Sequence, residues 1–208
     1  MRRLSPLESG TGPTIHHAGR EVILLSSNDY LGLATHPEVI RAAIHATEQY
    51  GTGSGASRLV SGTLPPHTHL ETSLATFKGT EAALLFGAGY LANIGIIPNL
   101  IGQGGLILAD RLCQASLIDG CRLSRADLRV FRHRDCAHLE SLLRRRSASR
   151  PTLIITEGLF SMDGDLAPLS DLASLAERYE ATLYVDDAHG TGIMGPTGRG
   201  TIEHFGLE

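Results

Sequence analysis

The sequence is nearly devoid of lysine. Of its 18 basic residues, only Lys78 is a lysine, so any reaction that requires a lysine amine has a single candidate. Cysteine is also scarce. Cys113, Cys121 and Cys136 are an odd number without metal-site spacing, which favours a reducing compartment such as the cytoplasm over a disulfide-linked scaffold. Neither sign of charge dominates, because the 18 basic residues face 22 acidic ones, and we therefore expect no nucleic-acid partner.

A long unbroken hydrophobic run is absent as well. Residues 82–109 carry no charge, but Pro98, several amide side chains and six glycines interrupt them. A membrane-spanning helix requires about 18 to 20 continuous apolar residues, so we expect no membrane association. The first residues, MRRLSP, lack the apolar segment of a secretory signal, which again favours the cytoplasm.

The 208 residues instead alternate between short apolar runs and helical patterns. Runs typical of buried strands lie at 22–25, 83–86, 106–109, 128–131, 153–156 and 183–185. Helical spacing is clearest for Leu70, Leu74 and Phe77, and for Leu169, Leu172, Ala173 and Ala176. This alternation predicts an α/β fold with a mostly parallel sheet and helices on both faces. The arginines at 144–146 follow another such pattern, and we interpret them as a solvated helix end.

Three of the predicted strands end in residues that could carry chemistry, and ligands of parallel sheets gather at such ends. Asp186, Asp187 and His189 follow one strand, and the acidic segment EGLFSMDGD (157–165) follows another. The segment GAGY (87–90) follows a third and begins a helix whose amides could bind a phosphate. The acids and the histidine could instead bind a metal, and the glycines could belong to a dinucleotide-binding loop. Taken singly, these features decide no function.

Five segments follow one another in an order typical of one enzyme family, and the match to that family extends over nearly the whole chain. They are SNDYLGL (27–33), GSGASRLVSGT (53–63), GTEAA (79–83), EGLFSMDGD (157–165) and DDAHGTG (186–192). In their residues and in their order they resemble the pyridoxal-phosphate (PLP)-dependent α-oxoamine synthases, most of all the branch that makes 8-amino-7-oxononanoate in biotin synthesis. The resemblance implies a fold-type I PLP-dependent transferase. It predicts an N-terminal segment (1–50) and a partial, truncated PLP-binding large domain (51–208), with the C-terminal domain absent.

The resemblance also implies a reaction and its partners. PLP would be the cofactor of an acyltransferase that condenses L-alanine with a pimeloyl thioester and releases carbon dioxide. The acyl carrier, coenzyme A or a carrier protein, stays open. A homodimer is implied for the full-length form.

Site residues follow from the same resemblance. The expected cofactor contacts are Gly89, Tyr90, Ser161, Asp186 and His189. Asp186 would keep the cofactor's ring nitrogen protonated, because a nearby carboxylate favours the charged form. The expected substrate contacts are Arg2, Asn28 and Gln114, and no metal ligand is expected.

Two departures from the family bear on activity. Gln114 stands where the family carries a histidine that stacks on the cofactor, and an amide offers no aromatic face and no titration near neutral pH. The family's Schiff-base lysine lies beyond residue 208, and Lys78 is expected to be an exposed residue at a helix end. We therefore predict no catalytic residue in this chain and no turnover by the chain alone. The alternatives are a non-catalytic remnant of the enzyme and a related synthase of the glycine C-acetyltransferase type.

Overall fold

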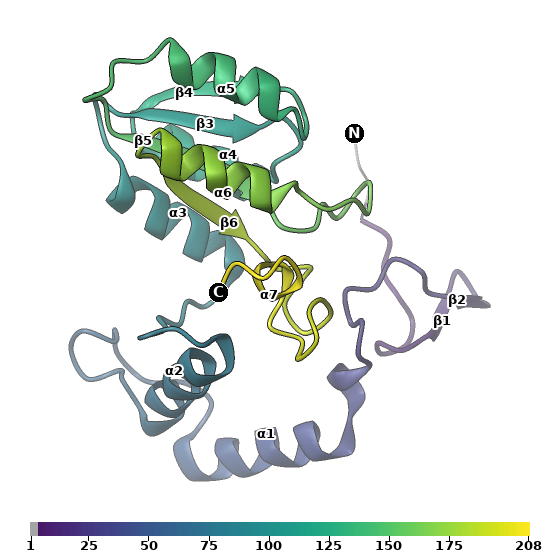
Figure 1. Ribbon diagram of the computed structural model, residues 1–208. Coiled ribbons are helices and arrows are strands. Elements are labelled where there is room, and N and C mark those ends of the chain that lie inside the picture. The colour runs from purple at the N-terminus through teal and green to yellow at the C-terminus, as the bar shows by residue number, and fades with distance from the viewer. Residues whose placement is uncertain (1–3) are drawn as a thin grey trace. The chain divides into compact units, whose positions relative to one another are not determined.

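The computed structural model describes residues 4–208, which form two compact units. Among the described residues, unit 1 comprises 4–76 and 81–83, and unit 2 comprises 77–80 and 84–208. Figure 1 labels the helices and strands. The predicted boundary between residues 50 and 51 stays a prediction.

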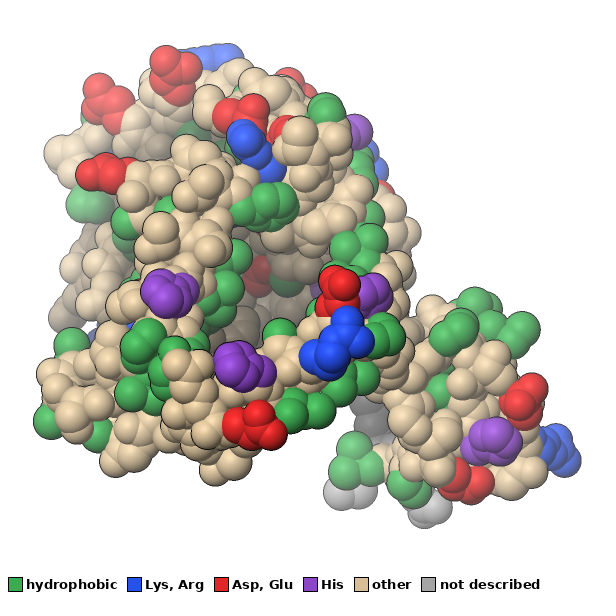
Figure 2. Space-filling model, turned by 90° about the horizontal axis from the view of Figure 1, so that it is seen from below, with side chains coloured by type: hydrophobic (Ala, Val, Ile, Leu, Met, Phe, Trp, Pro, Cys, Tyr) green, Lys and Arg blue, Asp and Glu red, His purple; other side chains and the backbone are tan. Residues whose placement is uncertain are grey.

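Unit 1 contains a hairpin and two helices. Strands β1 (Thr14–His17) and β2 (Arg20–Ile23) pair antiparallel, and a short 3-10 helix η1 (Leu33–Thr35) leads into α1 (Pro37–Tyr50) and α2 (Pro65–Lys78), whose last two residues belong to unit 2. Proline at the first position favours the start of α1, and the His36 ring accepts a hydrogen bond from the Glu38 N–H at 3.3 Å. Neither helix has a buried residue. Hydrophobic side chains are accordingly visible at the molecular surface in Figure 2.

Unit 2 is built on a four-stranded parallel sheet in the order β4-β3-β5-β6. The strands are β3 (Leu106–Asp110), β4 (Asp127–Phe131), β5 (Thr152–Glu157) and β6 (Thr182–Asp186). The helices are α3 (Gly89–Leu100), α4 (Ala115–Leu123), α5 (Cys136–Arg144), α6 (Leu169–Arg178) and α7 (Thr201–His204). The predicted α/β class and parallel sheet are confirmed.

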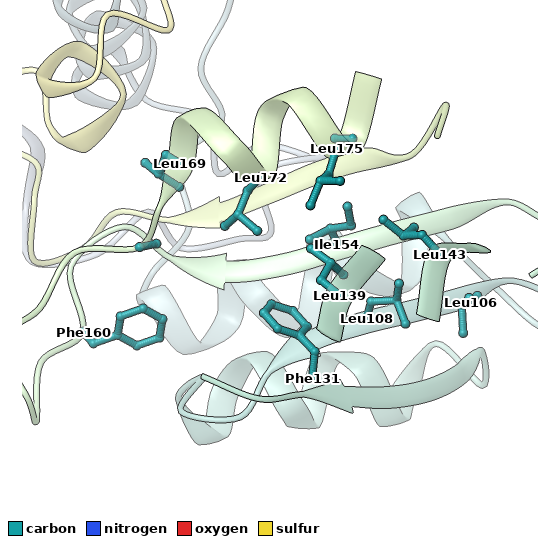
Figure 3. Close-up of a cluster of buried hydrophobic side chains, with 12 residues drawn as sticks. Leu106, Leu108, Phe131, Leu139, Leu143, Ile154, Phe160, Leu169, Leu172 and Leu175 are labelled. Atoms are coloured by element: carbon teal, nitrogen blue, oxygen red, sulfur yellow. The ribbon is translucent and has the colours of Figure 1, made fainter. Parts of the chain in front are cut away.

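The core of unit 2 has two halves, because successive side chains of a strand point to opposite faces of the sheet. Leu106, Leu108 and Ile154 pack against the apolar stripes of α5 and α6, as Figure 3 shows. Ile107 and Ile155, from the same strands, pack on the other face against α3 and α4. Helices on both faces explain why β3 and β5 are buried along their whole length.

Close contact between α3 and α4 depends on a glycine. A Cβ atom at Gly120 of α4 would lie 2.8 Å from the carbonyl oxygen of Asn93 and 2.9 Å from Ile97 Cδ1, both on α3. These distances are shorter than ordinary van der Waals contact, so any larger residue at position 120 pushes the two helices apart. Gly120 therefore permits α3 to pack closely on α4.

Three expectations from the sequence need correction. Residues 83–86 form no assigned strand, because an apolar run becomes a strand only where a neighbouring strand pairs with it. Lys78 is not an exposed helix end: its ammonium donates to the Thr191 hydroxyl and to the Arg199 carbonyl. Arg146 is not simply solvated, because its guanidinium donates to the Tyr179 carbonyl at the end of α6.

Among the described residues, no helix is both long and apolar enough to cross a membrane.

Candidate functional site

Three carboxylates stand at the carboxyl edge of the sheet of unit 2. Asp110 ends β3, Glu157 ends β5 and Asp186 ends β6, and Glu157 lies opposite Asp186 in the strand register. Burial, together with the charges of Asp186 and Asp110, raises the pKa of Glu157 to about 7, although hydrogen bonds from the N–H groups of Gln114 and Ser161 act in the opposite direction. The edge thus holds two carboxylates beside a third that titrates near neutral pH.

The Asp186 carboxylate is fixed by a buried asparagine. Asn93 Nδ2, on α3, donates to Asp186 Oδ2 at 2.8 Å, and the Ala188 N–H donates to Asp186 Oδ1 at 3.1 Å. Asn93 is itself held, since it also donates to Ser116 Oγ at 3.0 Å and accepts from the Tyr184 hydroxyl at 2.8 Å. Burial and the charge of Asp186 raise the pKa of Tyr184 to about 12, so this hydroxyl remains a donor. The carboxylate is therefore oriented before any ligand binds.

His189 contacts the residue that departs from the family pattern. Gln114 Nε2 lies 3.2 Å from His189 Nε2, and the Gln114 N–H donates to Glu157 Oε1 at 2.7 Å. An amide nitrogen only donates hydrogen bonds, so His189 Nε2 is the acceptor in this contact. Gln114 thus connects the loop after β3 with the ends of β5 and β6.

The predicted phosphate contacts lie at the start of α3. Gly89 is the first residue of this helix, and no side chain caps its N-terminal amides. The Tyr90 hydroxyl donates to Asp119 Oδ2 at 3.0 Å, which raises the pKa of Tyr90. The same helix carries Asn93 one turn later, about 6 Å along the axis. One helix therefore presents an anion-binding end and, a turn away, the partner of Asp186.

Asp187 faces different partners from Asp186, although the two are adjacent in sequence. Its carboxylate accepts from the N–H and the hydroxyl of Thr201, the latter at 2.6 Å, and lies 3.6 Å from Lys78 Nζ. The pair therefore does not converge on one point as metal ligands would. Asp187 instead secures the loop that follows β6, and Lys78 is occupied there.

The remaining predicted residues lie apart from this group or beyond it. Ser161 is exposed in the turn after β5, and its N–H donates to Glu157. Asn28 is exposed in unit 1, where its Oδ1 accepts from the Tyr30 hydroxyl at 3.4 Å. Arg2 lies outside the described residues. The structure therefore brings together Gln114, Asp186 and His189 in unit 2.

Sequence reasoning missed Asn93 and assigned no role to Glu157 or Ser116. Glu157 could have been found, because it ends an apolar strand beside Asp186. Asn93 gives a weaker signal: it is a polar residue inside an uncharged run, one turn after the glycine that begins α3. Its partner Asp186 lies 93 positions away, so no local pattern shows the contact.

The donor set fits PLP. A carboxylate held at a strand end suits a pyridine nitrogen that must stay protonated, and uncapped helix amides suit a phosphate. The Asn93 bridge places both on connected elements. The described residues contain no group of three or more metal-ligating side chains that could hold a metal ion.

Nearly the whole chain is similar to known proteins. The family model of aminotransferase class I and II matches residues 20–206. The 8-amino-7-oxononanoate synthase of Geobacter sulfurreducens is 55% identical over 98% of this chain and 52% of its own length. The 8-amino-7-oxononanoate synthase 1 of Bacillus subtilis is 46% identical over 99% of this chain and 52% of its own length. The chain thus spans about half the length of the curated relatives it matches.

Solved structures agree with the fold. A serine palmitoyltransferase from S. paucimobilis with a bound PLP–myriocin aldimine matches with a TM-score of 0.95 and 37% identity, over 99% of this chain and 52% of that one. An 8-amino-7-oxononanoate synthase from Francisella tularensis matches with a TM-score of 0.73 and 31% identity, over 88% of this chain and 50% of that one. The fold is that of the fold-type I PLP-dependent transferases, and the chain belongs to the aminotransferase class I and II family, whose members depend on PLP.

Proposed function

We propose that this chain is the cofactor-binding part of a cytoplasmic PLP-dependent acyltransferase of biotin synthesis. The reaction joins L-alanine to a pimeloyl thioester, releases carbon dioxide and yields 8-amino-7-oxononanoate. The observation that carries the proposal is the Asp186 carboxylate, which Asn93 orients at the sheet edge beside the Gln114–His189 contact. The relatives that bear this enzyme's name, at 55% and 46% identity, support the reaction.

Each proposed contact has a physical reason. The amides of Gly89 and Tyr90 at the start of α3 would bind the cofactor phosphate. Asp186 would hold the proton on the ring nitrogen, His189 would contact the phenolic oxygen and Ser161 would lie beside the ring. When bound, PLP supplies an electron sink for a carbanion. The sink is effective only while the ring nitrogen keeps its proton, which is the task of Asp186.

Gln114 would act by positioning His189, and it would not transfer protons. Its side chain reaches His189 and its N–H reaches Glu157, so it is held on both sides. An amide does not titrate near neutral pH, and the contribution of about 10² to 10⁴ in rate that a positioned acid or base makes is absent from this residue. Arg2 and Asn28 are proposed substrate contacts on the resemblance alone, as are the acyl carrier and the homodimer.

Lys78 supports the expectation that the chain alone forms no product. It is the only lysine among the 208 residues, and its ammonium is engaged by Thr191, Arg199 and Asp187. PLP bound by this chain would therefore be held without a covalent bond to a lysine side chain.

The first test is PLP binding by the purified 208-residue chain, followed by absorbance and fluorescence. We expect saturable binding to the wild type and binding weaker by about tenfold or more in Asp186→Asn, which loses the charge opposite the ring nitrogen. Asp163→Asn, an exposed acid in the turn after β5, is the matched control and should bind as the wild type does. Equal affinity of Asp186→Asn and wild type would contradict the proposal. Absence of binding would favour a non-catalytic remnant.

Borohydride reduction of the PLP-loaded chain tests the lysine. We expect mass spectrometry of the peptides to find Lys78 unmodified. Reduced PLP on Lys78 at stoichiometric level would contradict the expectation that its ammonium stays bound to the loop after β6.

A related α-oxoamine synthase is the second candidate. The TM-score of 0.95 to a serine palmitoyltransferase favours it, whereas the higher sequence identity to the oxononanoate synthases favours the first. Equilibrium binding of L-alanine, glycine and L-serine to the PLP-loaded chain discriminates between them. Preference for L-alanine supports the first candidate, and preference for glycine or L-serine supports the second.

A further inference from the structure

His133 is placed between two carboxylates that come from different elements. His133 Nδ1 lies 2.8 Å from Asp110 Oδ1, at the end of β3, and His133 Nε2 lies 3.0 Å from Asp165 Oδ2, in the segment after β5. The Asp110 side chain is 2% exposed and the His133 side chain 22% exposed, so water is largely excluded from the first contact. The imidazole therefore bridges the end of β3 and the segment that follows β5.

This geometry determines the protonation state of the ring. Carboxylate oxygens only accept hydrogen bonds, so each ring nitrogen must carry a proton, and a neutral imidazole has only one. Burial by itself would lower the pKa of His133, but its hydrogen bonds to Asp110 and Asp165 and their charges outweigh that effect and raise it. Arg134, which lies 2.9 Å from Asp165, is the other cation at this contact, and Arg132 is paired with Asp135 at 2.7 Å.

The contacts around His133 hold a turn that belongs to the candidate site. Asp110 Oδ2 also accepts from the Arg134 N–H at 2.9 Å, which anchors the segment after β4. The Phe160 ring meets the His133 ring edge to face at 4.5 Å between centroids, and the Phe160 N–H donates to the Asp165 carbonyl at 2.9 Å. Residues 160–165 thus close on themselves with Asp165 at one end. Ser161, whose N–H donates to Glu157, lies inside this turn.

We propose that His133, as an imidazolium, is a positioning residue that holds the turn 160–165, and with it Ser161, against the edge of the sheet. Loss of the ring proton as the pH rises removes one of the two hydrogen bonds and leaves two carboxylates facing a neutral ring. The turn then opens more often. The consequence for PLP binding rests on the proposed function, whereas the consequence for the turn does not.

The test begins without cofactor. In the labelled chain, the histidine resonance that is missing from His133→Gln should titrate above the ordinary value of 6.5. Amide exchange over 160–165, corrected for its intrinsic pH dependence, should accelerate by about tenfold as the pH rises through that midpoint. In His133→Gln, which keeps one donor but no charge, exchange should be fast at every pH. His45→Gln, which replaces an exposed histidine of α1, is the matched control and should exchange as the wild type does.

A second variant tests the proposal even if His133→Gln fails to fold. Asp165→Asn keeps the shape of the side chain and removes its charge, so the His133 midpoint should fall while the fold is retained. A His133 midpoint at or below 6.5, or unchanged exchange over 160–165 in His133→Gln, would overturn the proposal.

PLP affinity separates the two proposals. We expect His133→Gln to bind PLP about three- to tenfold more weakly than the wild type, with a smaller pH dependence. If the exchange results are as expected but the wild type does not bind PLP, the proposed function fails and the role of His133 in the turn stands. Equal PLP affinity of wild type and His133→Gln at all pH values would overturn the link between His133 and the site.

Discussion

The two units of the chain bury apolar side chains to very different extents. Unit 2 encloses two clusters, one on each face of its parallel sheet. In unit 1, Ile15 is the only buried apolar side chain among the described residues, and α1 exposes Val39, Ile40 and Ile44. A regular helix therefore need not pack against a hydrophobic core. Unit 2 is stabilised by burial, whereas unit 1 relies on local bonds, and isolated helices of this length are marginal in water.

Hydrogen exchange should show the largest difference. Amides of β3 and β5 should exchange only through global unfolding, because their strands are buried along their whole length. Amides of α1 should exchange faster by a factor on the order of 10³, through local opening. Mass spectrometry of peptides from both units, at two protein concentrations, measures this. Protection of α1 equal to that of β5 at both concentrations would contradict the comparison.

Substitutions of apolar side chains should destabilise unit 2 more than unit 1. Ile154→Ala removes a fully buried side chain between β5 and the helices α5 and α6, and should destabilise the protein by about 2 to 5 kcal/mol. Ile44→Ala, on a helix without buried residues, is the matched change and should alter stability by about 0.5 kcal/mol or less. Denaturant midpoints of the two variants give the comparison directly. Similar losses would show that α1 has a packing partner in solution.

A buried acid should make the stability of unit 2 depend on pH. The pKa of Glu157 rises from 4.5 to about 7 on folding. Between pH 4.5 and pH 7, the folded state therefore keeps a proton on Glu157 that the unfolded state has already lost. Stability therefore falls as the pH rises through this window. The advantage of Glu157→Gln over the wild type should grow by about 2 kcal/mol between about pH 5.5 and 8. Glu38→Gln, on the surface of unit 1, should show no such growth.

The smallest effect is expected within unit 1. Arg58 binds Glu71 through two hydrogen bonds of 2.6 and 3.0 Å, which tie the loop at 51–64 to α2. Arg58→Lys keeps the charge but cannot form both bonds, so exchange over 65–76 should accelerate by about two- to fivefold. Arg41→Lys, in the exposed pair with Glu38, is the control. An unchanged rate in Arg58→Lys would mean that another contact holds α2.

Much of unit 2 could be predicted from the sequence because its signals are local. The stripe of Leu169, Leu172 and Ala176 gives α6, and the apolar runs give the four strands of the sheet, of which β3 and β5 are buried. Strand ends then locate Glu157 and Asp186 without further information. The resemblance supplied roles for Asp186 and His189 that no periodicity contains.

The unpredicted features all depend on contacts between distant segments. Asn93 meets Asp186, Lys78 meets Asp187, and His133 meets Asp165, and in each pair the partner is set by how strands and helices stack. Residues 83–86 show the same limit for a strand, because apolar character says nothing about the neighbour. Local patterns thus give elements and strand ends, whereas the partners of buried polar groups require the assembled fold.

Gly120 is also expected to be sensitive to mutation. It has no reactive atom and touches no proposed ligand, yet its missing side chain lets α3, with Gly89 and Asn93, lie where it does. A genetic screen for loss of function should therefore recover substitutions at this position together with those at Asp186. Second-site suppressors of a Gly120 change should map to Ile97, which a new side chain would strike, and not to any residue that handles the substrate.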